Sequence, residues 1–295
     1  MEYLHSAETK KIINLIYEVR NEMKGGWSEE VYHRALYELL IDHKIPVLHK
    51  PRKELVHRNQ LIYTFEADLI VWDKIILELK VDPTFRGNRF PSHNQAQIIH
   101  YLKCFEKQIG LLVNFAHSKV GVKRMIYQLP EMEVIENYDY IQGVLNQGDR
   151  LELQEVRQKL LTLVNGIQTG YSEIVYNKIV CVELAFQGFK VESNLKVPAY
   201  WQNKRIGQDF ARHILVNDKF LILTRATLEH PPTIDFVQTK TYLESLGLKI
   251  GLVINFGKNK VQIKGVSVNQ NFLRSIPLKR ETETNSVART LDESG

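Results

Sequence analysis

The sequence predicts an α/β protein that is built from two copies of one domain. Residues 26–32 (GWSEEVY) recur as residues 170–176 (GYSEIVY), and residues 110–115 (GLLVNF) recur as residues 251–256 (GLVINF). Around these anchors, apolar residues at helical spacing and alternating strand patterns follow one another in the same order in both halves. A repeat unit of this length is too long for a solenoid and indicates a duplicated domain.

Each element of the first half has its own pattern. Residues 6–24 place Ile12, Ile16 and Val19 at helical spacing, and the following glycines end that helix. A second helix over 28–43 begins with acidic residues, which the helix dipole favours. Alternating residues then predict strands that short turns join as antiparallel hairpins. The expected order is strands at 46–57, 60–72 and 74–81, a helix at 93–106, an apolar strand at 109–115 and an edge strand at 120–127.

The second half repeats this order of elements. We expect helices near 152–166, 172–187 and 234–245, and strands near 190–198, 205–216, 219–226, 248–256 and 260–268. The two domains therefore run over 1–130 and 150–275, with a partly helical connector at 131–149. The polar composition of 276–295 predicts a disordered tail.

Composition excludes several classes of protein. The chain has 295 residues, of which 44% are hydrophobic and 25% charged, as in soluble globular proteins. No stretch of the sequence reaches the ~18 apolar residues that a membrane-spanning helix needs, and no signal-peptide pattern opens it. Two cysteines are too few for a disulfide framework, which favours a reducing, cytoplasmic location. The net charge of +5 is compatible with a polyanionic partner but does not identify one.

Three charged residues on two neighbouring strands form the candidate site. Glu78 and Lys80 lie two positions apart, so they share one face of their strand. Asp68 lies on the partner strand of the hairpin, close to opposite residue 78 or 79. Two carboxylates that meet in an apolar strand need a counter-charge, and hard oxygen ligands suit Mg²⁺ or Mn²⁺. The alternative is a solvated pair on an exposed face, against which Asp68 and the acidic helix start at Glu29 argue.

Five motifs follow one another along residues 10–127. They are Gly26-x-x-Glu29-x-x-Tyr32, Ala67-Asp68, Glu78-Leu79-Lys80, Gln97 followed by Tyr101-Leu102-Lys103, and residues 110–115. Together they resemble the GxxExxY family of the PD-(D/E)XK nuclease superfamily. The resemblance implies two tandem domains of the restriction-endonuclease-like fold, each a mixed β-sheet flanked by helices. It also implies Mg²⁺-dependent (or Mn²⁺-dependent) phosphodiester chemistry.

The resemblance assigns roles residue by residue. Asp68 and Glu78 match the metal ligands, Lys80 matches the catalytic lysine, and Glu29 matches an acid that completes the metal site through water. Gln97 and Tyr101 match the motif on the helix that lines the site.

The same resemblance predicts a function but no particular substrate. We expect a nuclease that hydrolyses DNA or RNA with its first domain, and two halves that pack as a pseudo-symmetric pair, as dimers of the superfamily do. Further self-association stays open. The loop between Pro83 and Pro91 is longer and more basic than the family pattern. Arg86 and Arg89 in this loop are candidates for contact with phosphate, and a solvated insertion is the alternative.

The second copy lacks the acids of the first. The residues at the places of Asp68, Glu78 and Lys80 are, in order, Arg212 or His213, Leu223 and Arg225. Asp209, the one nearby acid, faces the other side of the strand if Arg212 is the match and lies ~13 Å along the strand if His213 is, so it cannot replace Asp68. We therefore expect no catalytic metal in the second domain.

Two interpretations of the second domain stay open. In one, Arg212 and Arg225 form a phosphate-binding surface together with Lys204 and Arg205. In the other, the domain is a structural partner of the first. The alternative to a nuclease is a catalytically inactive nucleic-acid-binding or assembly module of the same fold.

Overall fold

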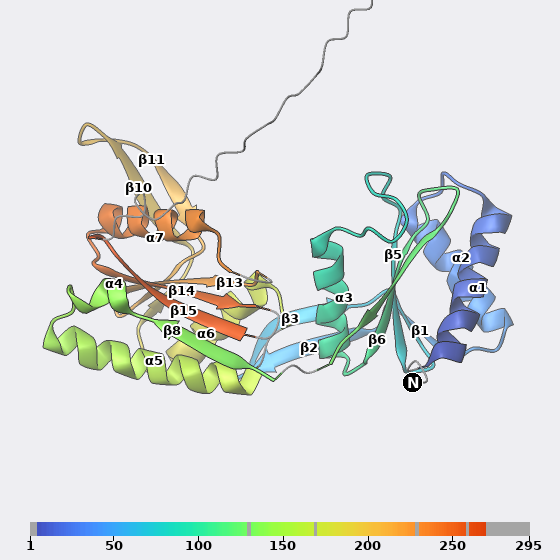
Figure 1. The fold of residues 1–295 in the computed structure, drawn as a ribbon, viewed down its shortest axis with the longest axis horizontal. Coiled ribbons are helices and arrows are strands. Elements are labelled where there is room, and N and C mark those ends of the chain that lie inside the picture. Colours follow the sequence, from blue (N-terminus) through green and yellow to red (C-terminus); the bar gives the residue numbers. More distant parts are fainter. Residues whose placement is uncertain (1–4, 129–130, 168–169, 228–229, 258–259, 270–295) are drawn as a thin grey trace, which may run out of the picture.

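The computed structural model describes residues 5–128, 131–167, 170–227, 230–257 and 260–269. Within these ranges it forms two domains of the same construction, which lie side by side along the long axis of the molecule (Figure 1). The tail that we predicted over 276–295 lies outside the described residues.

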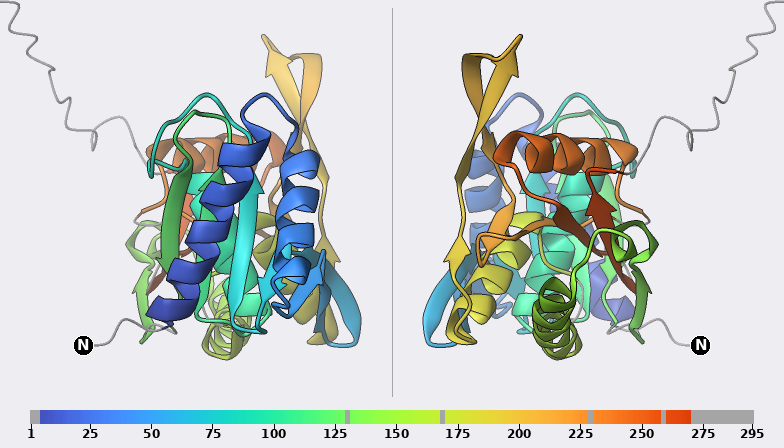
Figure 2. Two further views of the ribbon diagram at one scale, coloured as in Figure 1. Left: turned by 90° about the vertical axis from the view of Figure 1, so that its right-hand side faces the viewer. Right: turned by 90° about the vertical axis from the view of Figure 1, so that its left-hand side faces the viewer.

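The first domain is a five-stranded sheet with helices on both faces (Figure 1, Figure 2). Its elements are α1 (Ser6–Met23), α2 (Glu29–Asp42), β1 (Val47–His49), β2 (Arg52–His57), β3 (Gln60–Glu66), β4 (Leu69–Val71), β5 (Ile75–Lys80), α3 (Ser92–Cys104), β6 (Ile109–Asn114) and β7 (Gly121–Ile126). The strand order is β1-β4-β5-β6-β7, and β5 and β6 are parallel. Leu77 and Leu79 of β5 face α1 and α2, whereas Ile76 faces α3.

Two expected strands, 46–57 and 60–72, are each divided in the structure. β1 and β4 pair within the sheet, whereas β2 and β3 leave it as a separate two-stranded hairpin. The regular ladder stops because Lys50 takes a positive φ of 46° and Pro51 has no N–H to donate. Asp68 lies at the base of this hairpin, where its carbonyl accepts a hydrogen bond from the Lys50 N–H at 2.9 Å.

The second domain repeats this plan with one additional strand. Its elements are β8 (Glu133–Asn137), α4 (Asp139–Gln142), α5 (Gln147–Ile167), α6 (Glu173–Phe186), β9 (Val191–Glu192), β10 (Leu195–Trp201), β11 (Lys204–Ala211), β12 (Ile214–Val216), β13 (Phe220–Arg225), α7 (Thr233–Leu246), β14 (Ile250–Phe256) and β15 (Lys260–Ser267). The sheet order is β8-β15-β14-β13-β12-β9, and β10 and β11 form a separate hairpin. α5 and α6 cover one face and α7 the other.

Residues 131–149, which we expected to form a connector, belong to the second domain. β8 pairs in parallel with β15 and becomes an edge strand of the sheet. Ile141 of α4 is fully buried, and α5 begins at Gln147. The strand escaped sequence analysis because it is short and polar, and its residues are alternately exposed and half-buried rather than buried.

The two repeated motifs meet each other inside each domain. Tyr32 stacks on Phe115 with the ring centroids 4.5 Å apart, and Tyr176 stacks on Phe256 at 3.8 Å. Both tyrosines are fully buried. The tyrosine of the GxxExxY motif therefore holds the second helix against the sheet in both halves, which is a role in folding.

The domains meet where the β2–β3 hairpin packs against α6 (Figure 1). Ile62 and Phe65 of the hairpin belong to the hydrophobic cluster of the second domain, and Phe65 stacks on Tyr171 at 5.8 Å. Arg58 donates two hydrogen bonds to Glu183, at 2.8 Å and 2.9 Å. The two domains contribute different elements to this contact, so they do not form the pseudo-symmetric pair that we expected.

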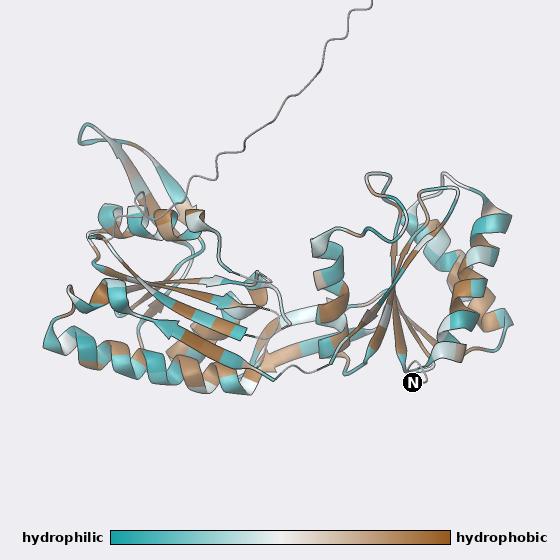
Figure 3. Ribbon diagram, viewed as in Figure 1, coloured by the Kyte–Doolittle hydropathy of each residue, from teal (hydrophilic) through white to brown (hydrophobic). Residues whose placement is uncertain are grey.

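Apolar residues concentrate along the strands of both sheets (Figure 3). Within the described ranges, no helix combines the length and the apolar character that crossing a membrane requires.

Candidate active site

The candidate site lies at the end of β5, where three segments of the first domain meet. Glu78 and Lys80 point to the same side of the strand, as the two-residue period requires. Asp68 reaches this strand from the base of the β2–β3 hairpin, and its Oδ2 accepts a hydrogen bond from the Leu79 N–H at 2.7 Å. Glu29 is the first residue of α2 and completes the group.

Glu78 is the most constrained member of the group. Its residue is only 2% exposed, and its Oε1 accepts a hydrogen bond from Lys80 Nζ at 2.6 Å. Its Oε2 is buried and makes no hydrogen bond. Burial and, after it, the charge of the neighbouring Asp68 raise the pKa of Glu78 to about 8, against the opposing effect of Lys80. Glu78 is therefore mostly protonated at neutral pH unless a further cation offsets the charge of the neighbouring acids.

Lys80 lies between two carboxylates. Besides its bond to Glu78, its Nζ is 3.7 Å from Glu29 Oε1. Burial lowers the pKa of Lys80, but the charges of Glu78, Glu29 and Asp68 outweigh burial and leave this pKa raised. Burial also raises the pKa of Glu29. Lys80 is therefore a protonated cation at neutral pH.

Gln97 and Tyr101 lie together on α3. The Gln97 side-chain amide donates to Tyr101 OH at 2.9 Å. Burial raises the pKa of Tyr101, and the charges of Glu78 and Asp68 raise it further, so this phenol lies within electrostatic reach of both acids. The structure thus brings Asp68, Glu78, Lys80 and Glu29 together at the end of β5, and it places Gln97 and Tyr101 on the neighbouring helix α3.

The donor set suits a divalent cation in its chemistry. The buried Glu78 Oε2 without a partner, next to the carboxylate of Asp68, supplies the hard anionic oxygens that Mg²⁺ prefers. Among the described residues, however, no three Asp, Glu, His or Cys side chains stand close enough to form a complete cage. Mg²⁺ commonly keeps several waters and binds through one or two carboxylates and substrate phosphate, so two acids meet its requirement.

The equivalent place in the second domain has different chemistry. Arg225 takes the position of Lys80, and its guanidinium bonds Glu173 at 2.7 Å and Asp235 at 2.7 Å. Arg212 also bonds Glu173, at 3.1 Å. The charges of both arginines are therefore offset by carboxylates of their own domain. Asp235 was missed by sequence analysis, because a single acid at a helix start carries no signal of its own.

Backbone contacts identify the residue that replaces Asp68. His33 of α2 bonds the Asp68 carbonyl oxygen at 3.1 Å, and Asn177, at the same place in α6, donates to the Arg212 carbonyl oxygen at 2.8 Å. Arg212 is therefore the counterpart of Asp68, and His213 is the additional residue.

The glutamine–tyrosine pair occurs in both domains. Gln238 donates to Tyr242 OH at 3.0 Å on α7, as Gln97 does to Tyr101 on α3. In the second domain, Tyr242 in turn donates to Asp209 at 3.0 Å. Because the pair persists without the acids, part of its role is to hold the helix in place.

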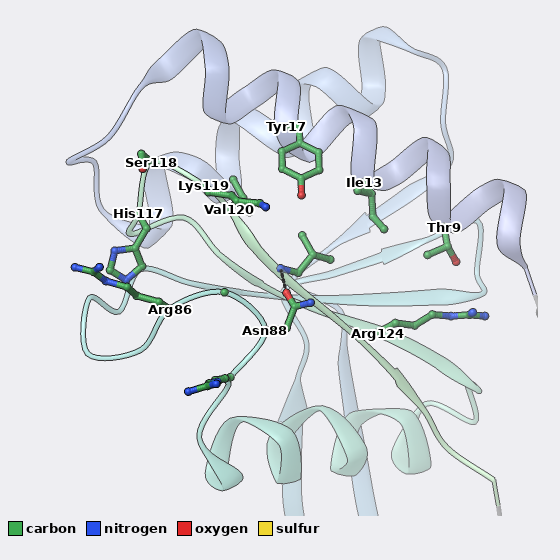
Figure 4. A pocket seen from close by; sticks show the side chains of 13 residues that line it. Thr9, Ile13, Tyr17, Arg86, Asn88, His117, Ser118, Lys119, Val120 and Arg124 are labelled. Atoms are coloured by element: carbon green, nitrogen blue, oxygen red, sulfur yellow. Dashed lines mark hydrogen bonds between the residues drawn. The ribbon is translucent and has the colours of Figure 1, made fainter.

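A basic groove lies beside the loop that follows β5 (Figure 4). The groove has a volume of about 910 Å³ and runs between α1 and β7. Four of its lining residues are cationic, namely Arg86, Arg89, Lys119 and Arg124, and none of the described residues that line it is acidic. Asn88 ties the loop to β7 by accepting a hydrogen bond from the Val122 N–H at 3.2 Å.

The remaining candidate cations stand apart from this groove. Lys204 and Arg205 begin β11 at the tip of the β10–β11 hairpin, where both are exposed. Arg212 and Arg225 are bound to Glu173 near α6. These four residues therefore do not form one surface.

A family model for the PD-(D/E)XK nuclease superfamily matches residues 6–125 and again residues 151–266. The chain belongs to the PD-(D/E)XK nuclease superfamily. Each match falls within one domain, so the expected fold of two tandem PD-(D/E)XK domains is confirmed. Membership suggests a nuclease-like function and implies a nucleic-acid substrate.

Among solved structures, the crystal structure of a protein named SSO0001 is similar to part of the chain. The identity is 20% and the TM-score 0.29, and the match covers 43% of this chain and 61% of that one, which is less than two thirds of its length. Comparison with the curated proteins gives no match.

Proposed function

We propose that the first domain is a metal-dependent nuclease of the GxxExxY branch, which hydrolyses phosphodiester bonds in DNA or RNA. The observation that supports this most strongly is the buried carboxylate of Glu78. Its Oε2 has no partner in the protein, and burial together with the charge of Asp68 raises its pKa to about 8, so a bound cation would be needed to keep it ionised at neutral pH. A buried acid in this state favours a bound cation.

The position of each residue suggests its role in the reaction. Asp68 and Glu78 would hold Mg²⁺ or Mn²⁺, and Glu29 would reach it through water. The bound ion supplies polarisation of the phosphate and a more acidic water. Lys80 offsets the negative charge that builds on the phosphoryl group, since it is protonated and held beside the acids. Tyr101, fixed by Gln97, lines the site.

Nucleic acid would contact the first domain through the basic groove. Arg86 and Arg89 line this groove, and both stand in the loop between β5, which ends at Lys80, and α3. Such contacts to phosphate position the substrate without reading its sequence. The second domain, whose Arg212 and Arg225 are already paired, would be non-catalytic.

Cleavage assays with Mg²⁺ or Mn²⁺ on DNA and RNA, single- and double-stranded, test this function. We expect Asp68→Asn and Glu78→Gln each to abolish cleavage. Glu133→Gln, which changes an exposed carboxylate of β8, should leave it unchanged. Persistent cleavage by the Asp68→Asn, Glu78→Gln double variant would refute the catalytic assignment.

A non-catalytic nucleic-acid-binding module is the second candidate. It is favoured by the lack of a complete metal cage among the described residues and by the bond of Lys80 to Glu78. This module would bind nucleic acid in a salt-dependent way and cut none with any divalent ion. Replacing Arg86 and Arg89 by alanine should then lower the slope of log affinity against log salt by about 2.

Calorimetric titration of Mn²⁺ separates the two candidates without a substrate. The nuclease should bind Mn²⁺ with a heat that Glu78→Gln removes, because that variant loses the anionic oxygens. The non-catalytic module should show no such heat in either protein.

A further inference from the structure

The contact between the two domains uses only half of the surfaces that the duplication provides. Each domain has one protruding hairpin, β2–β3 or β10–β11, and one helix at the matching place, α2 or α6. Within the chain, β2–β3 packs against α6. The β10–β11 hairpin and α2 take no part in that contact.

The occupied contact has a defined chemistry. The β2–β3 hairpin covers a stripe on α6, and that stripe consists of the buried residues Val175, Ile179, Val182 and Glu183. Ile62 of the hairpin is 4% exposed within this cluster. Arg58 at the hairpin tip bonds Glu183, and its guanidinium lies 4.4 Å from the ring centroid of Phe186. His57 of the hairpin also bonds Glu183, at 2.7 Å, so apolar side chains, the tip cation and this histidine make the contact.

The same stripe is uncovered on α2. The residues that match the buried stripe of α6 are Val31, Ala35, Glu38 and Leu39, none of which is buried. Val31 is 37% exposed, and Trp27, the counterpart of Tyr171, is 51% exposed. Tyr171 is the residue on which the docked hairpin stacks Phe65. The first domain thus presents an acceptor surface with no hairpin on it.

The β10–β11 hairpin has the register of the docked one. Its register shifts between Ala199 and Tyr200, where one residue of β11 is left without a partner. The register of β2–β3 shifts in the same way between Leu55 and Val56, where one residue of β3 is left without a partner. The shift leaves Ile206 at the position of Ile62, and Ile206 is 65% exposed. Three further large apolar side chains are exposed on this hairpin, namely Tyr200, Trp201 and Phe210. The base of the hairpin packs on α7, and its outer part exposes these apolar side chains, which makes it a surface for a partner.

The free hairpin and the free helix of one chain lie at opposite ends of the molecule, so they cannot reach each other (Figure 1). Their charges are complementary. Lys204 and Arg205 stand at the tip of the hairpin, and Glu38 and Asp42 are exposed on α2. Asp42 matches Phe186, which lies under the tip cation Arg58 in the occupied contact.

We propose that the β10–β11 hairpin of one copy of this chain docks on α2 of a second copy, by the contact that β2–β3 makes with α6 inside the chain. The two surfaces differ, so the contact is heterologous and does not close on a two-fold axis. Successive copies therefore add head to tail, and the assembly grows as a chain or closes as a ring.

Light scattering and sedimentation of the purified full-length chain test this assembly. The average mass of the wild type should rise with concentration. Ile206→Glu, which alters the hairpin, and Val31→Glu, which alters α2, should each weaken association about thirty-fold or more. Leu151→Glu changes an exposed apolar residue of α5 outside both surfaces and should assemble like wild type. A wild type that stays monomeric at every concentration, or an Ile206→Glu variant that assembles normally, would overturn the proposal.

Mixing the two variants gives a sharper result. Ile206→Glu keeps a competent α2, and Val31→Glu keeps a competent hairpin, so an equal mixture should form a one-to-one dimer and nothing larger. Circular dichroism checks that both variants are folded before they are mixed. A mixture that stays monomeric overturns the proposal. An Ile206→Glu variant whose assemblies have the same average mass as those of the wild type, but which binds nucleic acid more weakly, also overturns the proposal. That result would show that the hairpin binds nucleic acid.

Discussion

Lys80 and Arg225 occupy the same strand end in the two domains and pair with different carboxylates. Lys80 bonds Glu78, whose other oxygen has no partner. Arg225 bonds both Glu173 and Asp235, because a guanidinium offers several donors in a fixed fork. The duplication has therefore kept a cation at this place, and in the second domain Arg225 and Arg212 together offset the two carboxylates.

The pairing of Arg225 predicts a large effect on stability. Arg225→Leu leaves the buried Asp235 without its cation, and we expect it to lower the free energy of unfolding by about 3–5 kcal/mol. Arg212→Leu removes only an exposed ion pair and should change this energy by less than ~1 kcal/mol. Urea denaturation measures both, and similar losses for the two variants would contradict the prediction.

His213 predicts a dependence of stability on pH. Burial, with a smaller effect of Arg225, lowers the pKa of His213 from 6.5 to about 4. Below pH 6.5 His213 binds a proton in the unfolded chain, whereas in the folded protein it binds this proton only near pH 4. The free energy of unfolding should therefore fall by about 1.4 kcal/mol per pH unit through this window. Urea denaturation across the window should show a shallower fall for His213→Gln, and parallel curves would disprove the assignment.

Sequence reasoning brought the acids of the site together because strand periodicity fixes which residues share a face. The spacing of Glu78 and Lys80 is enough to place them on one face of the strand, and the hairpin turn is enough to place Asp68 close to them. The same reasoning did not find Asp235, since its partnership with Arg225 joins a helix to a strand and no local period encodes such a contact. It also left Arg212 and His213 as alternatives, which only the backbone contact of Asn177 separates.

At the scale of elements, the helices and central strands follow the sequence closely because each buries a continuous apolar pattern. The bend at Lys50 and Pro51 was missed because side-chain alternation continues across it while the backbone leaves the sheet. β8 was missed because an edge strand needs little apolar surface.

The two hairpins provide a matched pair of variants at this scale. Ile62→Ala removes a buried side chain from the contact with the second domain and should cost about 2–5 kcal/mol. Ile206→Ala, at the same register position of the exposed hairpin, should change stability by less than ~0.5 kcal/mol in a dilute solution of single chains. Equal effects in denaturant titrations would show that β2–β3 is not seated on α6.

At the scale of the whole molecule, the packing of the β2–β3 hairpin on α6 makes the two domains unfold together. The hydrogen bonds from Arg58, above all, lower the pKa of Glu183 to about 2, so the carboxylate stays ionised in the contact. We expect the wild type to unfold in one calorimetric transition near neutral pH. Glu183→Ala leaves Arg58 without this partner and should divide the transition in two.

A control for this experiment is Asp218→Ala, which breaks an exposed ion pair with Lys190 inside one domain. It should keep the single transition. A single transition in Glu183→Ala as well would mean that the domains are joined by other contacts.

The bent hairpin also has a mechanical consequence for the candidate site. Its far tip is held by the neighbouring domain, while its base carries Asp68, whose carboxylate accepts a hydrogen bond from Leu79, between Glu78 and Lys80 in the sequence. The hairpin thus connects the second domain directly to the candidate site of the first. A rotation of one domain against the other would therefore move Asp68 relative to Glu78 and Lys80, which gives the second domain an influence on the candidate site of the first.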